Sequence, residues 1–351
     1  MKSFTDMSIY DRQPARIGVL LQRIDVGRGR EELNRDQAPQ LLRSLAESAR
    51  VESIRASTAI EGIDVPADRA ARLAKPDEPR FRNRNEREFA GYRDAIDYIV
   101  GLPQRESPTV PFALHLHREI YRHTDGRGGY LKQEDNQISR RDAEGRREII
   151  FRPVSHRETP FYLSELTSRY ETAGRELVAH PLVLLASFVL DYLAIHPTLD
   201  GNGRVARLLT AHELLRLDYG VVRYVSIEQR IFETKNSYYA ALERSQRDWH
   251  EGRHSIWPWT EYLLEVISEA YEHFEERVAA AGTATTKQAR VREQILERGP
   301  AEFRFRDLKA ALPDVSDPTL RLVLNELRDA GSIRASGKGP ASRWIRTDGA
   351  R

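Results

Sequence analysis

The chain of 351 residues contains no cysteine. Disulfide bonds, thiolate metal sites and a cysteine nucleophile are therefore excluded, and the absence fits a reducing cytoplasm. An excess of either charge is also lacking, because 55 Lys and Arg stand against 53 Asp and Glu. With 40% hydrophobic and 31% charged residues, the composition indicates a globular chain of two or three domains rather than a disordered or highly basic one.

Long apolar runs are missing as well. The most apolar stretch, residues 181–195, is interrupted by Asp191 and is shorter than the roughly 20 residues that cross a bilayer. The first twenty residues contain no uninterrupted apolar segment of the kind found in signal peptides. We therefore expect a cytoplasmic protein with no membrane contact, and a buried core helix over the apolar stretch.

Apolar residues recur at helical spacing over most of the chain. The predicted helices lie at about residues 41–60, 83–101, 112–124, 160–175, 178–195, 205–217, 235–245 and 257–281. A polar segment, residues 137–151, has an Asp-Ala-Glu-Gly turn near its centre and predicts a β-hairpin. The sequence GTATTK at residues 282–287 predicts a linker.

After this segment the pattern predicts three short helices and then two β-like runs around a Gly-Lys-Gly-Pro turn, an order that looks like a winged helix-turn-helix. Residues 287–346 contain 13 Lys and Arg against 8 Asp and Glu, which supports a separate domain. Ser316 is the expected N-cap of the third helix. The buried stripe of that helix is predicted at Leu320, Val323, Leu324 and Leu327.

The opposite face of the third helix carries Arg321, Asn325 and Arg328, which a recognition helix would present to the major groove of DNA. The predicted wing adds four basic residues: Arg334, Lys338, Arg343 and Arg346. The same pattern also fits a solvated helix face on a domain that docks on another protein or on a second subunit. DNA binding and a homodimer therefore both stay open.

The stretch HPTLDGNGRVAR, residues 196–207, places a histidine, a carboxylate, two glycines, an asparagine and two arginines within twelve positions. Pro197 disfavours helical geometry at His196, so the core helix should end just before it. A new helix begins at about Gly203. The glycine-rich turn therefore lies at a helix N-terminus, where backbone N–H groups and the helix dipole form an anion cradle.

Charged side chains of this stretch complete the pattern. Arg204 and Arg207 are one turn apart, so both can face the same polyanion. Asp200 opposite such an anion requires a bridging cation, for which Mg²⁺ is suited. His196 is the group in reach that can take a proton near neutral pH. Together these residues predict transfer of a phosphorus-centred group to a hydroxyl.

The stretch resembles the signature of the Fic (Fic/Doc) family, His-x-Phe-x-Asp/Glu-Gly-Asn-Gly-Arg-x-x-Arg, at every polar position. It departs from the signature at Thr198, where the family usually has Phe. That side chain mainly anchors the loop in the core, so the departure concerns loop packing more than chemistry.

The resemblance implies a role for each residue of the loop. His196 would deprotonate a target hydroxyl, and Asp200 would hold Mg²⁺ on the α- and β-phosphates of ATP. Arg207 would hold the γ-phosphate. The implied anion hole consists of Gly201, Asn202, Gly203 and Arg204. The family member that phosphorylates its target carries Lys at the position of Gly203, so this glycine favours transfer of AMP with release of pyrophosphate.

Three further segments extend the resemblance. STAIEG, residues 57–62, is similar to the family's inhibitory motif, in which Glu61 would pair with Arg207; Ser57 and Glu61 are one helical turn apart and so face the same way. The hairpin stands where the family has a flap that aligns a target by strand pairing. Residues 235–245 resemble a segment whose tyrosines wall the adenine pocket, here Tyr238 and Tyr239, although a pair of core tyrosines is an equal interpretation.

The prediction is therefore an all-α Fic helical core with a small β-hairpin flap, plus a C-terminal winged helix-turn-helix. The expected domains are residues 1–105 with the inhibitory motif, residues 106–282 as the catalytic core, and residues 283–351 as the winged helix. The implied function is autoinhibited, Mg²⁺-dependent transfer of AMP from ATP to Ser, Thr or Tyr of an unknown protein or of the chain itself.

Two alternatives stay open. One is the reverse reaction, in which Glu61 positions a water that removes AMP from a modified protein. The other is a DNA-binding transcriptional regulator whose Fic core senses a nucleotide.

Zinc sites are not expected at HLHRE, because His115 and His117 are two residues apart and face different ways on a helix. His250 and His254 lack further ligands nearby in the sequence.

Overall fold

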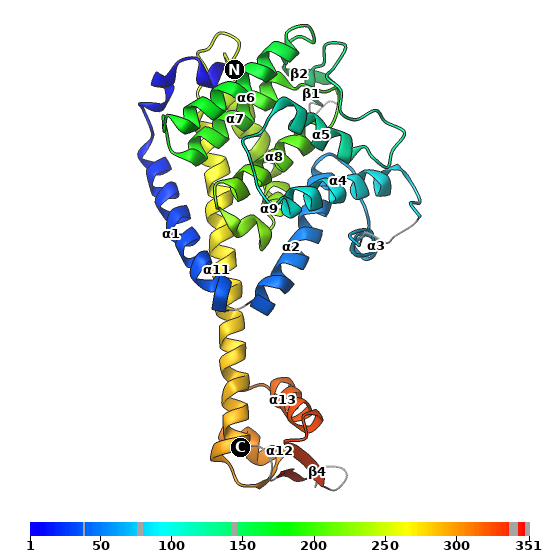
Figure 1. The fold of residues 1–351 in the computed structure, drawn as a ribbon, viewed down its shortest axis with the longest axis vertical. Coiled ribbons are helices and arrows are strands. Elements are labelled where there is room, and N and C mark those ends of the chain that lie inside the picture. The colour runs from blue at the N-terminus through cyan, green and yellow to red at the C-terminus, as the bar shows by residue number, and fades with distance from the viewer. Residues whose placement is uncertain (38, 76–79, 142–145, 337–342, 348–351) are drawn as a thin grey trace. The chain divides into compact units, whose positions relative to one another are not determined.

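The computed structural model describes the chain except for residues 38, 76–79, 142–145, 337–342 and 348–351 (Figure 1). The chain forms two compact units, residues 1–275 and 276–351. The domain boundaries drawn above after residues 105 and 282 rest on sequence motifs, and they stay predictions.

The first unit is helical apart from one hairpin. Its elements up to the hairpin are η1 (Lys2–Phe4), η2 (Met7–Tyr10), α1 (Ala15–Gln37), α2 (Pro39–Ile60), α3 (Ala67–Leu73), α4 (Arg84–Gly101) and α5 (Val110–Ile120). The later elements are α6 (Thr159–Arg175), α7 (Pro181–Ile195), α8 (Asn202–Arg216), η3 (Gly220–Arg223), α9 (Ile227–Glu233), α10 (Lys235–Gln246) and the start of α11 (Trp257–Glu293). The predicted helices are confirmed, with ends shifted by up to four residues, except that α11 continues twelve residues beyond its predicted end at residue 281.

Helices α1, α3 and α9 were not predicted. Helices α3 and α9 have seven residues each, which is too short to establish a period of 3.6. Helix α1 has a buried apolar stripe formed by Ile17, Leu20, Leu21 and Ile24. The stripe occupies only the first half of this arginine-rich helix, and three other apolar residues are about half exposed or more. These residues are Val19, Val26 and Leu33.

Helix α7 is the centre of the first unit. Every residue from Leu182 to Ile195 is buried, as expected for a helix that is apolar on all sides. It packs against α6 and α8, and α8 in turn contacts α2, α4 and α5 (Figure 1). Because α7 and α8 are consecutive, the turn between them is held in the middle of this helical cluster.

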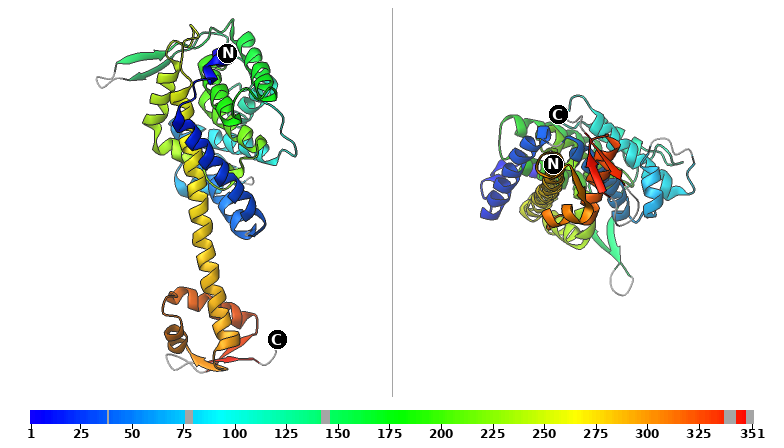
Figure 2. Two further views of the ribbon diagram at one scale, coloured as in Figure 1. Left: turned by 90° about the vertical axis from the view of Figure 1, so that its left-hand side faces the viewer. Right: turned by 90° about the horizontal axis from the view of Figure 1, so that it is seen from below.

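The predicted hairpin is confirmed. Strands β1 (Ile138–Arg141) and β2 (Arg147–Phe151) pair antiparallel, with an irregularity in the register between Ile138 and Ser139. The expected turn at residues 142–145 lies outside the described residues. Figure 2 shows the hairpin projecting from the helices of the first unit; of the strand residues whose side chains are described, only Phe151, at the base of β2, is buried.

The predicted linker at residues 282–287 is wrong, because the backbone of α11 is helical throughout this stretch. The stretch contains no proline, and a single glycine in a helix interior costs only about 1 kcal/mol relative to alanine. Helix-forming alanines precede it and charged residues follow, so the helix continues without interruption.

The second unit has its own core. After α11 come a short π-helical segment, Gln294–Arg298, then β3 (Glu302–Arg304), α12 (Phe305–Ala311), α13 (Asp317–Asp329), β4 (Ile333–Ser336) and β5 (Arg343–Arg346). The strands form an antiparallel sheet in the order β3-β5-β4. The predicted stripe of α13 is buried, and it packs with Val291, Ile295 and Phe303.

The elements of the second unit follow the predicted order, with β3 as an additional strand. The Gly-Lys-Gly-Pro turn, including Lys338, lies outside the described residues. Ser316 precedes α13 as expected, but its hydroxyl bonds to that of Thr319 rather than to a backbone N–H. The assignment as a winged helix stays a prediction.

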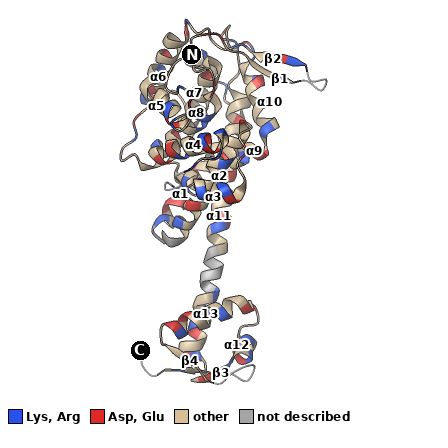
Figure 3. Cartoon of the chain, turned by 90° about the vertical axis from the view of Figure 1, so that its right-hand side faces the viewer, with Lys and Arg blue, Asp and Glu red and all other residues tan. Residues whose placement is uncertain are grey.

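Within the described residues, no helix combines the length and hydrophobicity needed to cross a membrane. Basic and acidic residues are interspersed along the helices of the first unit (Figure 3). This distribution agrees with the small net charge of +2 for the chain.

Candidate active site

A cavity of about 890 Å³ in the first unit brings most of the predicted site residues together. Those that line it are Glu61, His196, Asp200, Gly201, Asn202, Gly203, Tyr238 and Tyr239. Ser57, Arg204 and Arg207 are not among the lining residues and are themselves buried. The structure therefore divides the predicted set into residues that face the cavity and residues that support it.

The backbone at His196 explains how the imidazole reaches the cavity. Helix α7 ends at Ile195, as predicted, and His196 is its C-cap in the left-handed conformation, with φ of 50°. A non-glycine residue in this region is strained and needs support from its surroundings. Lys132 provides it: its ammonium donates to the Ile195 carbonyl at 3.0 Å, and its backbone N–H donates to the Pro197 carbonyl at 2.9 Å.

The protonation of His196 follows from its contacts. Nδ1 lies 3.2 Å from the Leu193 carbonyl, which can only accept, so Nδ1 carries the hydrogen and Nε2 is the free base. Burial lowers the pKa of His196 to about 4, and the nearby cation of Lys132 acts in the same direction. The imidazole is therefore neutral at pH 7 and able to accept a proton.

Thr198 anchors the loop by hydrogen bonds. Its backbone N–H donates to Oδ1 of Asn202 at 3.0 Å, and the Asn202 amide donates back to the Thr198 carbonyl at 2.7 Å. The threonine hydroxyl lies within hydrogen-bond distance of both the Asp200 carbonyl and Asn202 Oδ1. Both Thr198 and Asn202 are fully buried. A closed polar ring thus stands at the position where the Fic signature has a phenylalanine.

Asp200 presents its carboxylate to the cavity. Oδ1 accepts from the backbone N–H of Gly201 at 2.7 Å, and Oδ2 accepts from the hydroxyl of Tyr121 at 2.8 Å. Partial burial opposes ionisation, but these hydrogen bonds and the charge of Arg204 prevail and lower the pKa of Asp200. The side chain is still 70% exposed. It is therefore an ionised carboxylate with lone pairs accessible from the cavity.

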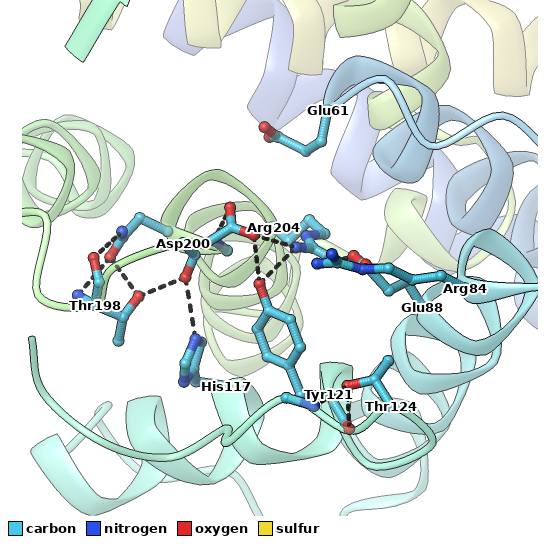
Figure 4. Close-up of polar contacts among 12 residues, drawn as sticks. Glu61, Arg84, Glu88, His117, Tyr121, Thr124, Thr198, Asp200 and Arg204 are labelled. Carbon is cyan, nitrogen blue, oxygen red and sulfur yellow. Dashed lines mark hydrogen bonds and ion pairs between the residues drawn. The ribbon is translucent and has the colours of Figure 1, made fainter. Parts of the chain in front are cut away.

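Arg204 is turned away from the cavity. Its guanidinium is 1% exposed and donates to Glu88 at 2.6 Å and to the hydroxyl of Tyr121 at 2.9 Å. It also lies 3.6 Å from Oδ2 of Asp200. Figure 4 shows Arg204 between Glu88 and the pair formed by Tyr121 and Asp200. In this structure its charge acts on the loop through Asp200; its predicted place in the anion hole is untested.

Arg207 is held by the upstream helix α2. Its Nε donates to the hydroxyl of Ser57 at 2.7 Å, and its Nη2 donates to the Ser57 carbonyl at 2.9 Å and to Oε1 of Glu61 at 2.8 Å. The expected contact between Glu61 and Arg207 is therefore present, although α2 already ends at Ile60. Burial opposes the charge of Arg207, but Glu61 raises its pKa, so the pair is ionic.

Gly203 makes this contact sterically feasible. A Cβ at position 203 would lie 2.4 Å from Oε1 of Glu61 and 3.3 Å from Nη1 of Arg207. Any side chain here would push the carboxylate away from the arginine. The glycine thus serves the Glu61 contact as well as the N-terminus of α8.

The two tyrosines of α10 differ in their surroundings. Tyr238 is buried and packs edge-on against Trp259 and Tyr262. Tyr239 is 45% exposed, and the ammonium of Lys235 lies 5.9 Å from its ring centre. Both line the cavity. Tyr238 is therefore mainly a core residue, whereas the ring of Tyr239 is available to a ligand.

Sequence reasoning missed several supporting residues. Lys132, Glu88 and Tyr121 carry no recognisable motif, and each acts through a partner far away in the sequence. Lys235 was also missed; its ammonium binds the last carbonyl of α2, that of Ile60, at 2.5 Å. One usable signal was the spacing of His117 and Tyr121, which are four residues apart and share a helix face.

Comparison with known proteins agrees with this geometry. Residues 108–214 match the model of the Fic/DOC family. A Fic family protein from Desulfovibrio desulfuricans G20 has 22% sequence identity and a TM-score of 0.64, with 97% of this chain and 98% of that chain covered. A Fic domain containing signaling protein from Bacteroides thetaiotaomicron VPI-5482 has 20% identity and a TM-score of 0.56, with 74% and 95% covered.

Fic-1 from C. elegans, residues 134–508, is also similar, with 20% identity, a TM-score of 0.56, and 74% of this chain and 71% of that chain covered. At these identities the solved structures support the fold, while the family model supports the assignment of the segment that contains the loop. The chain therefore contains a Fic/DOC family domain at residues 108–214.

Proposed function

We propose that this chain is an autoinhibited protein adenylyltransferase, which transfers AMP from ATP to a Ser, Thr or Tyr hydroxyl of a target protein or of itself. The observation that carries the proposal is the contact of Glu61 with Arg207, beside a cavity that also exposes a neutral His196. A site with a base, an anion cradle and a removable blocking carboxylate is suited to a regulated transfer.

The chemical step uses His196. The target hydroxyl approaches the α-phosphorus of ATP and gives its proton to Nε2, the free nitrogen of the imidazole. A bond forms between the hydroxyl oxygen and the α-phosphorus, the bond from phosphorus to the β-phosphate oxygen breaks, and pyrophosphate leaves. The protonated His196 then returns the proton to solvent.

The phosphates would lie at the N-terminus of α8. The N–H groups in the first turn of a helix have no intrahelical partner, and Gly201, at φ of 80°, turns the chain into this helix. The backbone N–H groups of Asn202, Gly203 and Arg204 are therefore suited to bind phosphate oxygens.

Mg²⁺ fits the donor set. Among the described residues, no cluster of three or more His, Cys, Asp or Glu side chains is arranged to hold a metal. The exposed carboxylate of Asp200 is a single oxygen donor group beside the proposed phosphate site. Mg²⁺ is commonly held by one or two carboxylates together with substrate phosphates. When bound, it would neutralise charge on the phosphates while Asp200 fixes its position.

Glu61 would inhibit by occupying Arg207. An arginine whose Nη2 donates to Glu61 and Ser57 cannot clamp the γ-phosphate with the same hydrogen bonds. The carboxylate also adds a negative charge at the cavity wall, next to Gly203. ATP would then bind with its α-phosphate out of line with the hydroxyl, and misplacement of this kind costs about a hundredfold in rate.

The reverse reaction is the alternative at the same site. Glu61 and His196 line one cavity, so the carboxylate could orient a water for removal of AMP from a modified protein. The two directions differ in the effect of Glu61: its removal raises transfer in the first case and abolishes hydrolysis in the second.

The first test replaces Glu61 by glycine. With Arg207 and its γ-phosphate contact released, transfer of label from α-labelled ATP to proteins of a lysate and to the chain itself should rise by about a hundredfold. The measurement is the initial rate of label incorporation at equal protein concentration. The double variant Glu61→Gly, His196→Ala should incorporate no label, since release of inhibition does not replace the base.

Glu47→Ala serves as the control, because Glu47 is an exposed glutamate on the same helix. It should label at the wild-type rate. If folded Glu61→Gly protein labels no faster than this control, the autoinhibition proposal is wrong.

The second test is the pH dependence of the Glu61→Gly enzyme. A base whose pKa is about 4 remains deprotonated well below neutral pH, so the rate at saturating ATP and Mg²⁺ should stay level down to about pH 5. The rate should fall only as the pH drops through about 4. An acid limb centred near 6.5, the ordinary value for histidine, would contradict the neutral, buried state of His196.

For the second unit we propose contact with duplex DNA through α13. Arg321, Asn325 and Arg328 are exposed on the face opposite the buried stripe. The guanidinium of Arg321 lies over the ring of Phe305 at 4.7 Å, which holds it at the surface of the helix pair. An exposed pair of arginines on a helix that follows another short helix suits contact with phosphates and base edges.

The third test measures binding of the full chain to duplex DNA by fluorescence anisotropy at several salt concentrations. Affinity should fall steeply with salt, and replacing Arg321 and Arg328 by alanine should weaken binding and reduce the logarithmic salt slope by about 2. Arg175→Ala, an exposed arginine of α6, is the control and should change neither. No binding at low salt would favour a protein partner for this unit.

A further inference from the structure

Helix α5 supplies two side chains to the catalytic loop. His117 belongs to the HLHRE segment, where the spacing predicts no zinc site, and Tyr121 follows one turn later as the C-cap of the helix. Both are buried and both bind Asp200, His117 at the main chain and Tyr121 at the carboxylate. Figure 4 shows the two side chains reaching the same residue from the same helix.

The direction of the Tyr121 hydrogen bond is determined by its second partner. Nη2 of Arg204 lies 2.9 Å from the tyrosine oxygen, and a guanidinium can only donate. The single hydroxyl hydrogen is therefore free to go to Oδ2 of Asp200, at 2.8 Å. Arg204 is in turn fixed by Glu88, so the tyrosine is oriented by a buried ion pair.

The direction of the His117 hydrogen bond is determined in the same way. The backbone N–H of Gly129 donates to Nδ1 at 2.8 Å, so Nδ1 has no hydrogen. The hydrogen is on Nε2, which donates to the main-chain carbonyl of Asp200 at 3.1 Å. The imidazole is thus held in one tautomer and binds the backbone of Asp200 from the side of α5.

Close packing keeps this arrangement in place. A Cβ at Gly201 would lie 2.9 Å from Cδ1 of Ile120 and 3.3 Å from the hydroxyl oxygen of Tyr121. The residue after Asp200 therefore lies directly on α5. The carbonyl of Asp200 accepts from His117 and from the hydroxyl of Thr198, Oδ1 accepts from the backbone N–H of Gly201, and Oδ2 accepts from Tyr121. Asp200 lines the cavity, and its side chain is 70% exposed.

We propose that Tyr121 and His117 are positioning residues that hold Asp200 in the orientation needed to bind the divalent cation of a metal–nucleotide complex. The inference rests on the proposed role of Asp200 as the cation ligand. Groups that orient a metal ligand through hydrogen bonds typically contribute 10- to 100-fold to metal affinity. A purely structural role would instead affect stability and all nucleotide binding alike.

The test measures binding rather than turnover. Binding of ATP is measured by calorimetry with excess Mn²⁺ and again with EDTA, in a Glu61→Gly, His196→Ala parent that cannot transfer AMP. The ratio of the two affinities gives the contribution of the metal. Tyr121→Phe, which removes only the hydroxyl, should lower this ratio by about 10- to 100-fold and leave the affinity in EDTA unchanged.

Three comparisons make the result specific. Tyr130→Phe removes the hydroxyl of a tyrosine that is 66% exposed, and it should leave the ratio unchanged. Asp200→Ala should abolish the metal contribution, and adding Tyr121→Phe to it should have no further effect, because the tyrosine acts through Asp200. His117→Gln should lower the ratio in the same direction as Tyr121→Phe.

The outcomes separate the inference from the proposed transfer activity. A Tyr121→Phe protein with the parent's ratio, or with equal losses in Mn²⁺ and EDTA, would overturn the positioning role. A parent whose ATP affinity is the same in Mn²⁺ and EDTA would overturn the role of Asp200 and the inference with it. If the chain failed to transfer AMP, the conclusions of this binding experiment about Tyr121 and about Asp200 would still stand.

Discussion

The buried guanidinium of Arg207 is the group on which the rest of the site depends. A charge that is 3% exposed requires partners, because an unpaired buried cation is strongly destabilising. Here the partners come from the upstream helix α2, as the hydroxyl and carbonyl of Ser57 and the carboxylate of Glu61. The segment before the Fic/DOC domain therefore completes the charge balance of helix α8.

This arrangement gives Arg207 two alternative partners. Glu61 satisfies the cation in the absence of nucleotide, and the γ-phosphate of ATP would satisfy it in the proposed active state. The hydroxyl of Ser57 accepts from Nε, whereas Glu61 accepts from Nη2, so the Ser57 hydroxyl need not move when the carboxylate leaves. Since Glu61 lies just beyond the end of α2 and is 30% exposed at its side chain, a local change there is sufficient for the exchange.

The loop between α7 and α8 is by contrast fixed from several sides. Lys132 supports its start, the ring of hydrogen bonds between Thr198 and Asn202 closes it, and α5 binds Asp200. Buried polar groups that are all satisfied specify one conformation. The cavity thus combines a loop that is fixed from several sides with a carboxylate that leaves Arg207 in the proposed active state.

The sequence predicted what depends on local pattern. The end of α7 at Ile195 follows from Pro197, and the start of α8 follows from the glycine-rich turn. The approach of Glu61 to Arg207 was expected from a resemblance rather than from geometry. Lys132 has no local signal, because its partner Ile195 is more than sixty residues away. Tyr121 shares a helix face with His117, but its partner Asp200 is 79 residues away, and only the packing of α5 against α8 brings the two together.

The prediction of a linker at residues 282–287 was wrong for a related reason. Composition alone does not show whether the helical segments on either side continue through such a stretch. Thr198 shows the converse case. The threonine at this position of the signature predicted a change in loop packing. In the structure, hydrogen bonds to Asn202 hold the loop in place of an apolar anchor, and the identity of one residue could not predict these bonds.

The most direct test of the account is the difference in affinity between ATP and ADP, measured by calorimetry with Mg²⁺. If Glu61 occupies Arg207, wild-type protein should bind the two nucleotides alike, whereas Glu61→Gly should bind ATP at least about tenfold more tightly, as expected for a charge-assisted hydrogen bond worth about 1.5–3 kcal/mol. Adding Arg207→Ala should remove that advantage. A wild-type protein that already prefers ATP by the same factor as Glu61→Gly would contradict the account.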